Sequence, residues 1–507
     1  MGLRDKQCQW KHRNDLQCYE LLNVVYCNDV KVPELQCMNI YVPEAYFKSD
    51  MSKNIKSKVG KFTSLSAPIV FENSIGGYSE AAPETIDNPW CKGKEFLNAG
   101  MIYISVGARG KQTVGEHGEF IGKAPIGLVD LKAAIRFIKH NRECLPGDVN
   151  KIISVGVSAG GAMSSLLGCT GNSEEYLSLL EESGAMMEET DDIYGAQCYC
   201  PIIDLSHGDI AYEWMFSNVT NYKGMGHNNG GELTPFQEEL SKVLKFHYPS
   251  YFNSLSLVNP DTLENLIIGN DYRSGSAYEY LLSIIEKAAE KHLKLIEKNK
   301  LNLKCTVEDY LKGNYTYKRH HGKNVIEIQG IDKTKWLTYD GTKVKITSLD
   351  DMIKYYLPRL KSCPAFDSLE NNQPENQVFG DETTDYLHFD NYVLEAIEKL
   401  KPKYPEEYNK YFRSYEKMKG DNDLQYRVEA IDPFIHIGTE RQGKLAPYYR
   451  IRVGTRDAHT SFTMAMILAL KLEETKETKV DYAMVWDEDH GPADYAGELC
   501  QWINSIC

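Results

Sequence analysis

The sequence contains no apolar run long enough to cross a membrane, and it has no excess of basic residues. A membrane-spanning helix needs about 20 consecutive apolar residues. In the 507-residue chain, 72 Asp and Glu outnumber 57 Lys and Arg, which gives a formal net charge of −15. A nucleic-acid-binding surface needs a basic stripe to meet the phosphates. We therefore expect neither a membrane nor a nucleic acid as a partner.

We also expect no secretion signal, and the cysteines follow no regular pattern. Residues 1–20 have no apolar core of the kind that a signal peptide needs. The 13 cysteines are scattered without the spacing of a disulfide framework. Free thiols are typical of a reducing compartment, so we expect a cytoplasmic protein. Cys198 and Cys200 lie in one apolar run, which favours small buried residues over a metal-binding pair. We predict no metal ion and no cofactor.

Apolar runs alternate with helical patterns between about residues 18 and 205. This alternation is typical of an α/β protein whose mostly parallel sheet is covered on both faces. A helix is predicted over 127–141, and its basic side chains, Lys132, Arg136 and Lys139, are expected to form a solvated face. The predicted strands span residues 38–43, 67–74, 101–107, 151–157 and 195–204.

The pattern changes after the fifth predicted strand. Residues 206–430 are rich in Tyr, Lys, Glu and Asn, and polar loops separate their long helical patterns. Two more strand-like runs follow, at 448–453 and 482–486. We therefore predict a core formed by residues 1–205 and 431–507. A large, mainly helical cap (lid) domain, residues 206–430, is inserted before the last two sheet strands.

The stretch "GVSAG", residues 156–160, joins a predicted strand to a predicted helix. In a G-x-S-x-G nucleophile elbow, the serine occupies a sharp turn that exposes its hydroxyl, and the glycines let strand and helix approach closely. Ser158 holds that place here. Gly and Ser are also common in ordinary strand-to-helix turns, so the pentapeptide by itself leaves both interpretations open.

A candidate acid and a candidate base follow the last two predicted strands. A serine hydroxyl needs a neutral imidazole to accept its proton, and the imidazole needs a carboxylate that fixes its tautomer. In the α/β-hydrolase arrangement, serine, acid and histidine occur in this order, each after a strand. Asp457 follows the strand at 448–453, and His490 follows the strand at 482–486. The order predicts Ser158, Asp457 and His490 as catalytic residues.

Each assignment has an alternative. His459 lies two residues from Asp457 on the loop of the acid, so His490 is favoured as the base. Asp432 precedes the penultimate strand and is the weaker acid candidate. Three acidic residues on the histidine's own loop are expected to be solvated: Asp487, Glu488 and Asp489.

Acyl transfer also needs backbone N–H groups that stabilise the oxyanion of the tetrahedral intermediate. One expected donor is Ala159, at the start of the predicted helix. The second is expected from the glycine-containing loop after the strand at 67–74, where Gly77 lies. A plain Gly-Gly turn is the alternative at this position. Together with the serine, the acid and the histidine, this loop favours an α/β-hydrolase fold.

Several longer stretches resemble the bacterial tannases, or tannin acyl hydrolases, over nearly the whole chain. The resemblance implies an α/β-hydrolase core with a large inserted cap, and hydrolysis of galloyl esters by Ser158, Asp457 and His490. The matching stretches are "APIVFENSIGGY", "GARGKQTVGEHG", "KAPIGLVDLKAAIRFIKHN", "LPGDVNKIISVGVSAGGAMSSL", "YCPIIDLSHGDIAYEWMF", "KSCPAFDSLENNQPENQVFGD" and "RIRVGTRDAHTSF".

The resemblance also implies which residues contact the substrate ring. Lys361 and Glu375 fall in stretches where the bacterial tannases keep a lysine and a glutamate that hydrogen-bond the ring hydroxyls. Phenolic hydroxyls both donate and accept, so a cation and a carboxylate can bracket them. The family has a second aspartate two residues beyond the catalytic one, and His459 stands at that place. His459 is therefore the third expected substrate-binding residue.

We expect a serine ester hydrolase that cleaves esters of hydroxylated aromatic acids through an acyl-serine intermediate, with a small-molecule aromatic ester as its partner. A feruloyl or cinnamoyl esterase, or a general carboxylesterase without galloyl selectivity, is the alternative. The reason is His459, because an imidazole lacks the charge and the two acceptor oxygens of a carboxylate. A third hypothesis is a catalytically silent interaction protein with a hydrolase fold.

Overall fold

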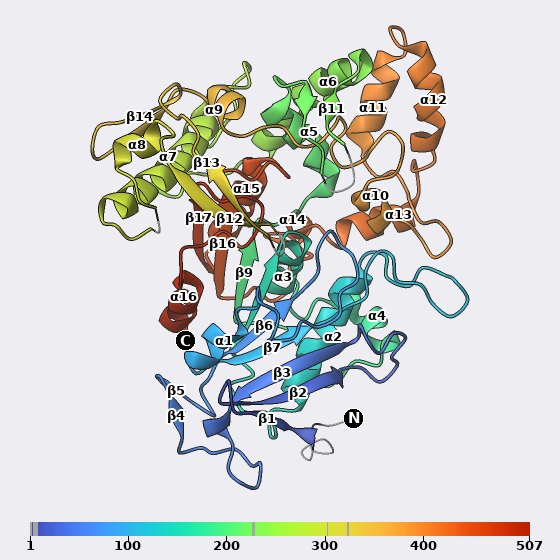
Figure 1. Cartoon of the computed structure of the whole chain (residues 1–507). Helices are drawn as coiled ribbons and strands as arrows, with labels where there is room; N and C mark the ends of the chain where they lie inside the picture. The colour runs from blue at the N-terminus through green and yellow to red at the C-terminus, as the bar shows by residue number, and fades with distance from the viewer. Residues whose placement is uncertain (1–2, 4–8, 226–228, 302, 322–323) are drawn as a thin grey trace.

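The computed structural model describes residues 3, 9–225, 229–301, 303–321 and 324–507. Its central element is a nine-stranded sheet with the order β1-β2-β3-β7-β6-β8-β9-β16-β17 (Figure 1). Strands β7, β6, β8, β9, β16 and β17 pair in parallel with one another, whereas the pairs β1–β2, β2–β3 and β3–β7 are antiparallel. The prediction of an α/β protein with a mostly parallel sheet is confirmed.

The strands of this sheet are short and mostly buried. They are β1 (Lys11–Arg13), β2 (Cys18–Val25), β3 (Cys37–Pro43), β6 (Ile69–Asn73), β7 (Ile102–Val106), β8 (Ile152–Val157), β9 (Gly195–Tyr199), β16 (Tyr448–Gly454) and β17 (Lys479–Val485). The helices before β9 and after β16 are η2 (Glu44–Tyr46), α1 (Gly93–Asn98), α2 (Ile126–His140), α3 (Ala159–Cys169), η3 (Glu174–Tyr176), α4 (Leu177–Glu182), α15 (Phe462–Thr475) and α16 (Glu498–Ile506). A small hairpin consists of β4 (Lys58–Val59) and β5 (Phe62–Thr63).

Seven strands of the sheet overlap the seven apolar runs of the sequence. These are β3, β6, β7, β8, β9, β16 and β17. The antiparallel strands β1, at the edge of the sheet, and β2, next to it, were not predicted. Strand β1 has no apolar residue, and the polar pair formed by Glu20 and Asn23 interrupts the apolar residues of β2. Edge strands with one exposed face give a weaker apolar signal than central strands that are buried on both faces.

The basic side chains of α2 do not face solvent, so that prediction is wrong. Lys132, Arg136 and Lys139 are at most 5% exposed. Asp191 binds Lys132 at 2.7 Å and Arg136 at 2.6 Å, and Asp192 binds Lys139 at 2.8 Å. Periodicity within α2 could not show this, because the neutralising carboxylates lie on a segment some fifty residues further along the chain.

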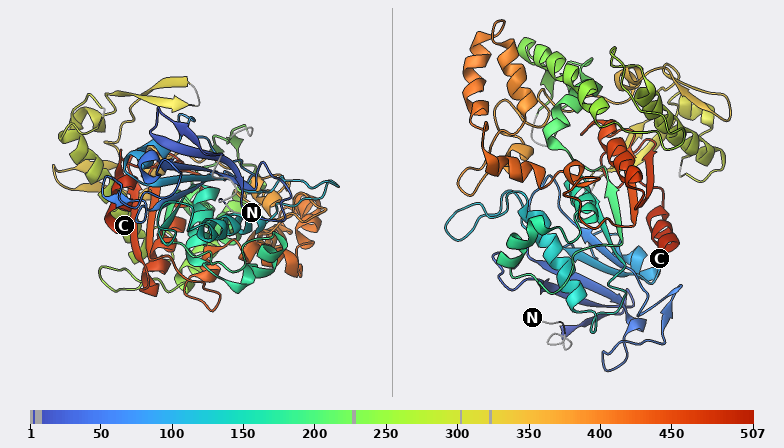
Figure 2. Two further views of the ribbon diagram at one scale, coloured as in Figure 1. Left: turned by 90° about the horizontal axis from the view of Figure 1, so that it is seen from below. Right: turned by 180° about the vertical axis from the view of Figure 1, so that it is seen from behind.

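Between β9 and β16 lies a part of the chain that we call the intervening segment. Its described residues form ten helices and three two-stranded sheets. Figure 1 shows it gathered at the end of the molecule opposite the β1–β3 edge, and Figure 2 shows it from below and from behind. The mainly helical pattern was predicted, and the hairpins were not. Its helices are α5 (Leu205–Phe216), α6 (Pro235–Ser254), α7 (Ser276–Glu297), α8 (Val307–Leu311), α9 (Leu349–Tyr355), α10 (Pro374–Val378), α11 (Asn391–Leu400), α12 (Pro405–Glu416), α13 (Asn422–Glu429) and α14 (Pro433–His436). Its strands are β10 (Asn221–Tyr222), β11 (Gly231–Glu232), β12 (Thr316–His321), β13 (Asn324–Gln329), β14 (Leu337–Tyr339) and β15 (Val344–Ile346).

One continuous hydrophobic core joins the sheet, its helices and the intervening segment. Trp214, Trp336 and Trp486 are at most 1% exposed, and the first two come from the intervening segment. Trp336 and Trp486 stack with ring centroids 6.0 Å apart. The intervening segment is therefore packed against the end of β17, where Trp486 lies. In the part of the chain that the structure describes, no helix combines the length and the apolar character needed to cross a bilayer.

We predict that Asp191→Asn lowers the free energy of unfolding by about 3–5 kcal/mol, because the substitution leaves two buried cations without a counter-charge. Burial disfavours the Asp191 carboxylate, but Lys132 and Arg136 outweigh this effect and lower its pKa. The stabilisation is therefore complete above the pKa of the unfolded chain and is lost as the pH falls through the lower pKa of the folded protein. Urea denaturation at neutral pH measures the difference.

Glu308→Gln is the control for Asp191→Asn, since it breaks the exposed pair of Glu308 with Lys312, whose side chains are 75% and 53% exposed. Exposed pairs contribute little to stability. Equal midpoints for the two variants would contradict the assignment of Asp191 as the counter-charge of α2.

Candidate active site

Ser158 lies at the sharp turn between β8 and α3. Its φ of 62° and ψ of −122° place a residue other than glycine in a strained backbone region, as a nucleophile elbow requires. Two backbone hydrogen bonds hold the turn, because Ser158 N donates to Tyr199 O at 2.9 Å and Ile202 N donates to Ser158 O at 3.3 Å. Ser158 is partly exposed, whereas Ala159 after it is buried. The strand-turn-helix context favours the elbow over an ordinary turn.

Gly156 and Gly160 allow the close approach of β8 and α3 at this turn. A Cβ on Gly156 would lie 2.0 Å from the carbonyl oxygen of Gly160, and a Cβ on Gly160 would lie 2.6 Å from Asn73 Oδ1. Asn73 Nδ2 donates to the carbonyl oxygens of Val155 and Gly160, both at 3.2 Å. The end of β6 is therefore tied to the elbow, and no larger residue fits at either glycine.

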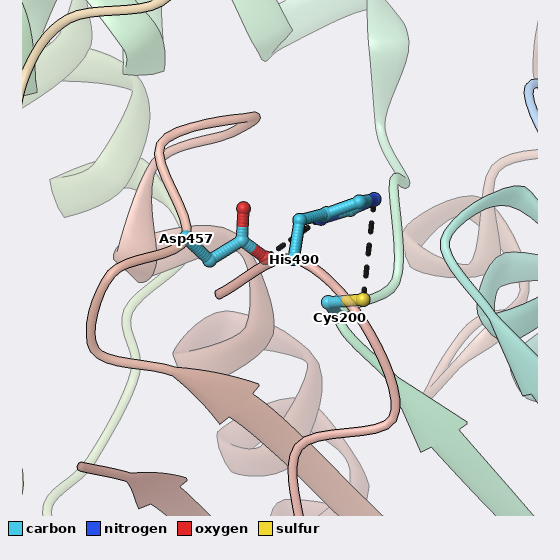
Figure 3. A group of neighbouring side chains, drawn as sticks. All are labelled: Cys200, Asp457 and His490. Carbon is cyan, nitrogen blue, oxygen red and sulfur yellow. Dashed lines mark hydrogen bonds and ion pairs between the residues drawn. The ribbon is translucent and has the colours of Figure 1, made fainter. Parts of the chain in front are cut away.

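Asp457 and His490 meet at the carboxyl ends of β16 and β17. Asp457 Oδ2 lies 2.8 Å from His490 Nδ1, and Figure 3 shows the carboxylate directed at this side of the ring. Asp457 is 1% exposed, and its other oxygen accepts a hydrogen bond from His459 N at 3.0 Å. The carboxylate therefore stabilises a proton on Nδ1 and leaves Nε2 as the reactive nitrogen.

The two groups shift each other's pKa in opposite directions. Burial disfavours protonation of His490, but the charge of Asp457 and its hydrogen bond outweigh burial and raise the pKa of His490 above its ordinary value. Burial also disfavours the Asp457 carboxylate, and His490 outweighs it and lowers the pKa of Asp457. Asp457 is therefore ionised in the folded protein, and His490 binds a proton more tightly than a free imidazole does.

Cys200 borders the other side of the His490 ring. Its Sγ lies 4.0 Å from His490 Nε2 (Figure 3). The same Sγ lies 3.4 Å from Gly491 O. Among the hydrogen bonds of the described residues, none joins Ser158 to His490. Cys200 is 1% exposed, which agrees with the prediction of a small buried residue, but it follows β9 directly and so lies with the loops of the site. This place after the carboxyl end of a strand is the signal by which Cys200 could have been found.

His459 stacks on His490. The two ring centroids are 3.8 Å apart, and the ring planes are inclined by 7°. Burial and the proximity of His490 lower the pKa of His459 to about 3, so His459 is neutral at physiological pH. His459 thus contacts the predicted base itself.

The other acidic candidates have different partners. Asp432 caps α14 and accepts a hydrogen bond from Phe434 N at 2.9 Å. Asp487 is not solvated as predicted, because Tyr356 donates to its Oδ1 at 2.7 Å. Two further groups contact its Oδ2, namely the hydroxyls of Tyr310 and Tyr315. The prediction failed because these tyrosines come from the intervening segment, far from Asp487 in sequence.

Hydrogen bonds to three consecutive carbonyl groups hold the loop after β6 in place. Gly76 O accepts from Ser79 N at 3.0 Å, Gly77 O accepts from Lys111 Nζ at 2.5 Å, and Tyr78 O accepts from Lys111 N at 3.0 Å. The N–H of Gly77 belongs to the same planar peptide as the carbonyl of Gly76, so it points the opposite way. Lys111 is only 6% exposed, and sequence reasoning did not single it out. Its role is to fix the loop that carries the predicted oxyanion donor.

Lys361 and Glu375 form a buried pair from the intervening segment. Lys361 Nζ lies 3.7 Å from Glu375 Oε1 and 3.5 Å from the centre of the Phe366 ring. Their side chains are 8% and 12% exposed. Burial lowers the pKa of Lys361, and the charges of Glu375, Asp209 and Asp457 oppose this shift. Glu375 Oε2 is buried and has no hydrogen-bond partner among the described residues. This oxygen is available to a donor on a ligand.

A large cavity of about 720 Å³ lies in the intervening segment. Lys361 lines it, together with Phe236, Tyr411 and Glu370. Of the predicted site residues, Lys361 is the one that this cavity includes; Ser158, Asp457 and His490 are not in its lining. Position after the strand ends, rather than cavity size, therefore identifies the candidate active site.

We predict that the His490 imidazole titrates above the ordinary histidine pKa of about 6.5, and that Asp457→Asn lowers this pKa. The substitution removes the negative charge that favours the protonated ring. NMR of protein labelled with ¹⁵N in histidine measures both values against pH, and His490→Gln assigns the signal. An unchanged His490 pKa in Asp457→Asn would show that the two groups are not coupled.

Comparisons with known proteins found one matching family model and several similar solved structures. A family model described as BD-FAE matches residues 78–200, which include Ser158. No curated protein sequence matches the chain. Three similar solved structures are a tannin acyl hydrolase from Lactobacillus plantarum, a tannase from Fusobacterium nucleatum, and a tannin acyl hydrolase in complex with ethyl gallate.

The similarity to these structures extends over nearly the whole chain. The Lactobacillus plantarum enzyme is 30% identical with a TM-score of 0.78, and the match covers 97% of this chain and 94% of that one. The Fusobacterium nucleatum enzyme is 31% identical with a TM-score of 0.77, and the match covers 96% of this chain and 95% of that one. The enzyme in the ethyl gallate complex is 29% identical with a TM-score of 0.77, and the match covers 97% of this chain and 94% of that one. The sheet order and these matches identify an α/β-hydrolase fold, and the chain belongs to the bacterial tannin acyl hydrolase family.

Proposed function

We propose that the protein is a serine ester hydrolase that cleaves galloyl and related esters of hydroxylated aromatic acids. The observation that carries this proposal is the Asp457–His490 pair. His490 Nε2 faces Cys200, and the preceding residue, Tyr199, accepts a hydrogen bond from Ser158 N at the elbow. A family member of the same architecture has been solved in complex with ethyl gallate. The pair and the elbow supply the groups that acyl transfer needs.

In the first half of the reaction, Ser158 Oγ attacks the ester carbonyl and its proton passes to His490 Nε2. Asp457 holds the proton on Nδ1 and balances the charge of the imidazolium. The N–H groups of Ala159 and Gly77 stabilise the oxyanion. When the intermediate collapses, the bond to the alcohol oxygen breaks, and this oxygen takes the proton from Nε2. The aromatic acid remains as an ester of Ser158.

In the second half, a water molecule replaces the alcohol. It gives one proton to His490 Nε2 and attacks the acyl carbon, and the bond from this carbon to Ser158 Oγ then breaks. Ser158 regains its proton from Nε2, and the aromatic acid is released. Both halves require Nε2 to start without a proton, so His490 serves as base only in its neutral form.

The aromatic ring is proposed to lie against Lys361 and Glu375. Lys361 offers donors, and the unpartnered Oε2 of Glu375 offers an acceptor to a phenolic hydroxyl. A buried acceptor without a partner is costly, so a ring hydroxyl that donates to it gains affinity. Both residues come from the intervening segment, which supports a lid role for residues 206–430 between the core parts 1–205 and 431–507.

A feruloyl or cinnamoyl esterase is the second candidate, and the observation in its favour is His459. The His459 imidazole is neutral and stacks on His490. It therefore offers the hydroxyls of the substrate ring no negative charge. A ring with fewer hydroxyls needs fewer such partners. We therefore expect the protein to prefer gallate esters less strongly than a variant with a carboxylate at position 459.

The ratio of kcat/KM on methyl gallate to kcat/KM on methyl ferulate tests this proposal. We expect hydrolysis of methyl gallate, and we expect His459→Asp to raise the ratio about tenfold. The added carboxylate accepts a hydrogen bond from a buried hydroxyl, which is worth about 1–3 kcal/mol.

His117→Asp is the control for the added charge, because His117 lies on an exposed loop. A ratio that stays the same in His459→Asp would contradict the proposed ring pocket. No hydrolysis of either ester by the unsubstituted protein would contradict the proposed function itself.

A further inference from the structure

The thiol of Cys200 lies beside His490, and the proposed hydrolysis gives it no role. It faces Nε2, the nitrogen at the opposite end of the ring from Asp457 (Figure 3). The Sγ, imidazole and carboxylate ligand atoms of the three residues all lie within 4.8 Å of one another. They come from the ends of three adjacent strands, β9, β16 and β17, so the sheet itself brings them together.

The Asp457–His490 hydrogen bond prepares Nε2 for a metal ion as well as for a proton. A histidine that binds a metal through one nitrogen usually donates the other N–H to a carboxylate, which fixes the ring and raises its basicity. Asp457 does this for His490 at 2.8 Å. Thiolate sulfur and imidazole nitrogen are the ligands that Zn²⁺ and Cd²⁺ prefer. Cys200 and His490 offer one of each.

The distance between these two ligand atoms suits a shared ion. Bonds of about 2.3 Å to sulfur and about 2.0 Å to nitrogen put the two atoms about 3.5 Å apart at a tetrahedral angle and about 4.3 Å apart when collinear. The observed 4.0 Å lies between these limits. The Cys200 backbone is held in place, because its N–H donates to Arg452 O at 2.7 Å. Little movement is therefore needed to admit an ion.

We infer that Cys200 Sγ and His490 Nε2 form a binding site for a thiophilic divalent cation, Zn²⁺ or Cd²⁺, which inhibits ester hydrolysis. On binding, the thiol releases its proton to solvent and sulfur binds as the thiolate. The ion occupies the Nε2 lone pair, and water molecules complete its coordination. The inhibition rests on the proposed function, since this lone pair is the one that accepts the proton of Ser158.

Asp457 stays outside the first coordination sphere in this site. Its Oδ2 keeps the hydrogen bond to Nδ1, and its Oδ1 keeps the one from His459 N. The ion reaches the site from the substrate side, since the His490 side chain is 13% exposed while Cys200 is buried. One thiolate, one imidazole and water make a weaker site than the four protein ligands of a structural zinc centre, so the inhibition is reversible by chelation.

Metal binding is tested first without catalysis, in Ser158→Ala protein titrated with CdCl₂. Cadmium-edge X-ray absorption of the one-to-one complex should show one sulfur and one imidazole nitrogen in the first shell. The ultraviolet charge-transfer band from thiolate to cadmium should be lost in Ser158→Ala/Cys200→Ser and kept in Ser158→Ala/Cys305→Ser. Cys305 is a matched control, since it is a partly exposed free thiol outside the site. Coordination by oxygen alone, or a band that survives without Cys200, would overturn the site.

Inhibition is then measured with ZnCl₂ during hydrolysis of methyl gallate, relative to the uninhibited rate of each variant. The zinc concentration for half inhibition should rise at least about tenfold in Cys200→Ser and in Cys200→Ala, and stay unchanged in Cys305→Ser. Equal sensitivity of all variants would overturn the inference. If the protein hydrolyses no ester, the proposed function fails, while the cadmium experiment still decides whether the metal site exists.

Discussion

The carboxylate of Asp457 lies buried against Nδ1 of His490, and the arrangement of the candidate site depends on this hydrogen-bonded pair. An ionised carboxylate without partners would be costly at such a depth. The parallel register of β16 and β17 pairs Gly454 with Val485 and so places the two following loops side by side. Arg456 N then donates to Glu488 O at 2.9 Å, which joins the loops by their backbones. The sheet thus fixes the base before any substrate contact is made.

The intervening segment also contacts the two loops that carry Asp457 and His490. The Tyr356 hydroxyl lies 3.0 Å from Thr455 Oγ1 and 2.7 Å from Asp487 Oδ1, so one side chain contacts both the loop of Asp457 and the loop of His490. The charge of the Asp457 carboxylate also acts on Lys361, a buried cation of the intervening segment. Movement of the segment would therefore change the surroundings of the base as well as the ring pocket. In the proposed reaction, this contact between the intervening segment and the loops of Asp457 and His490 would link substrate binding to proton transfer.

The sequence predicted those elements that a local pattern of apolar residues marks. Seven strands of the sheet could be found because they are apolar runs. Ser158, Asp457 and His490 were predicted as site residues because each follows such a run. Contacts between distant segments could not be found. Lys132 and Arg136 have the pattern of a solvated face, but in the structure they form buried ion pairs with Asp191. Asp487 has the pattern of a solvated loop residue, but it accepts a hydrogen bond from Tyr356 of the intervening segment. The burial of Cys200 was predicted correctly, so the sequence indicated a core residue. Its contact with His490 could not be predicted, because His490 lies 290 residues further along the chain.

The central claim is that the Asp457–His490 pair activates the hydroxyl of Ser158, although Nε2 faces the thiol of Cys200 in the resting protein. Reaction with a fluorophosphonate probe, followed by peptide mass spectrometry, tests it most directly, since the probe modifies the activated nucleophile. The account predicts one adduct, on Ser158, which forms much more slowly in His490→Gln. An adduct on Cys200, or labelling that persists after Ser158→Ala, would contradict it.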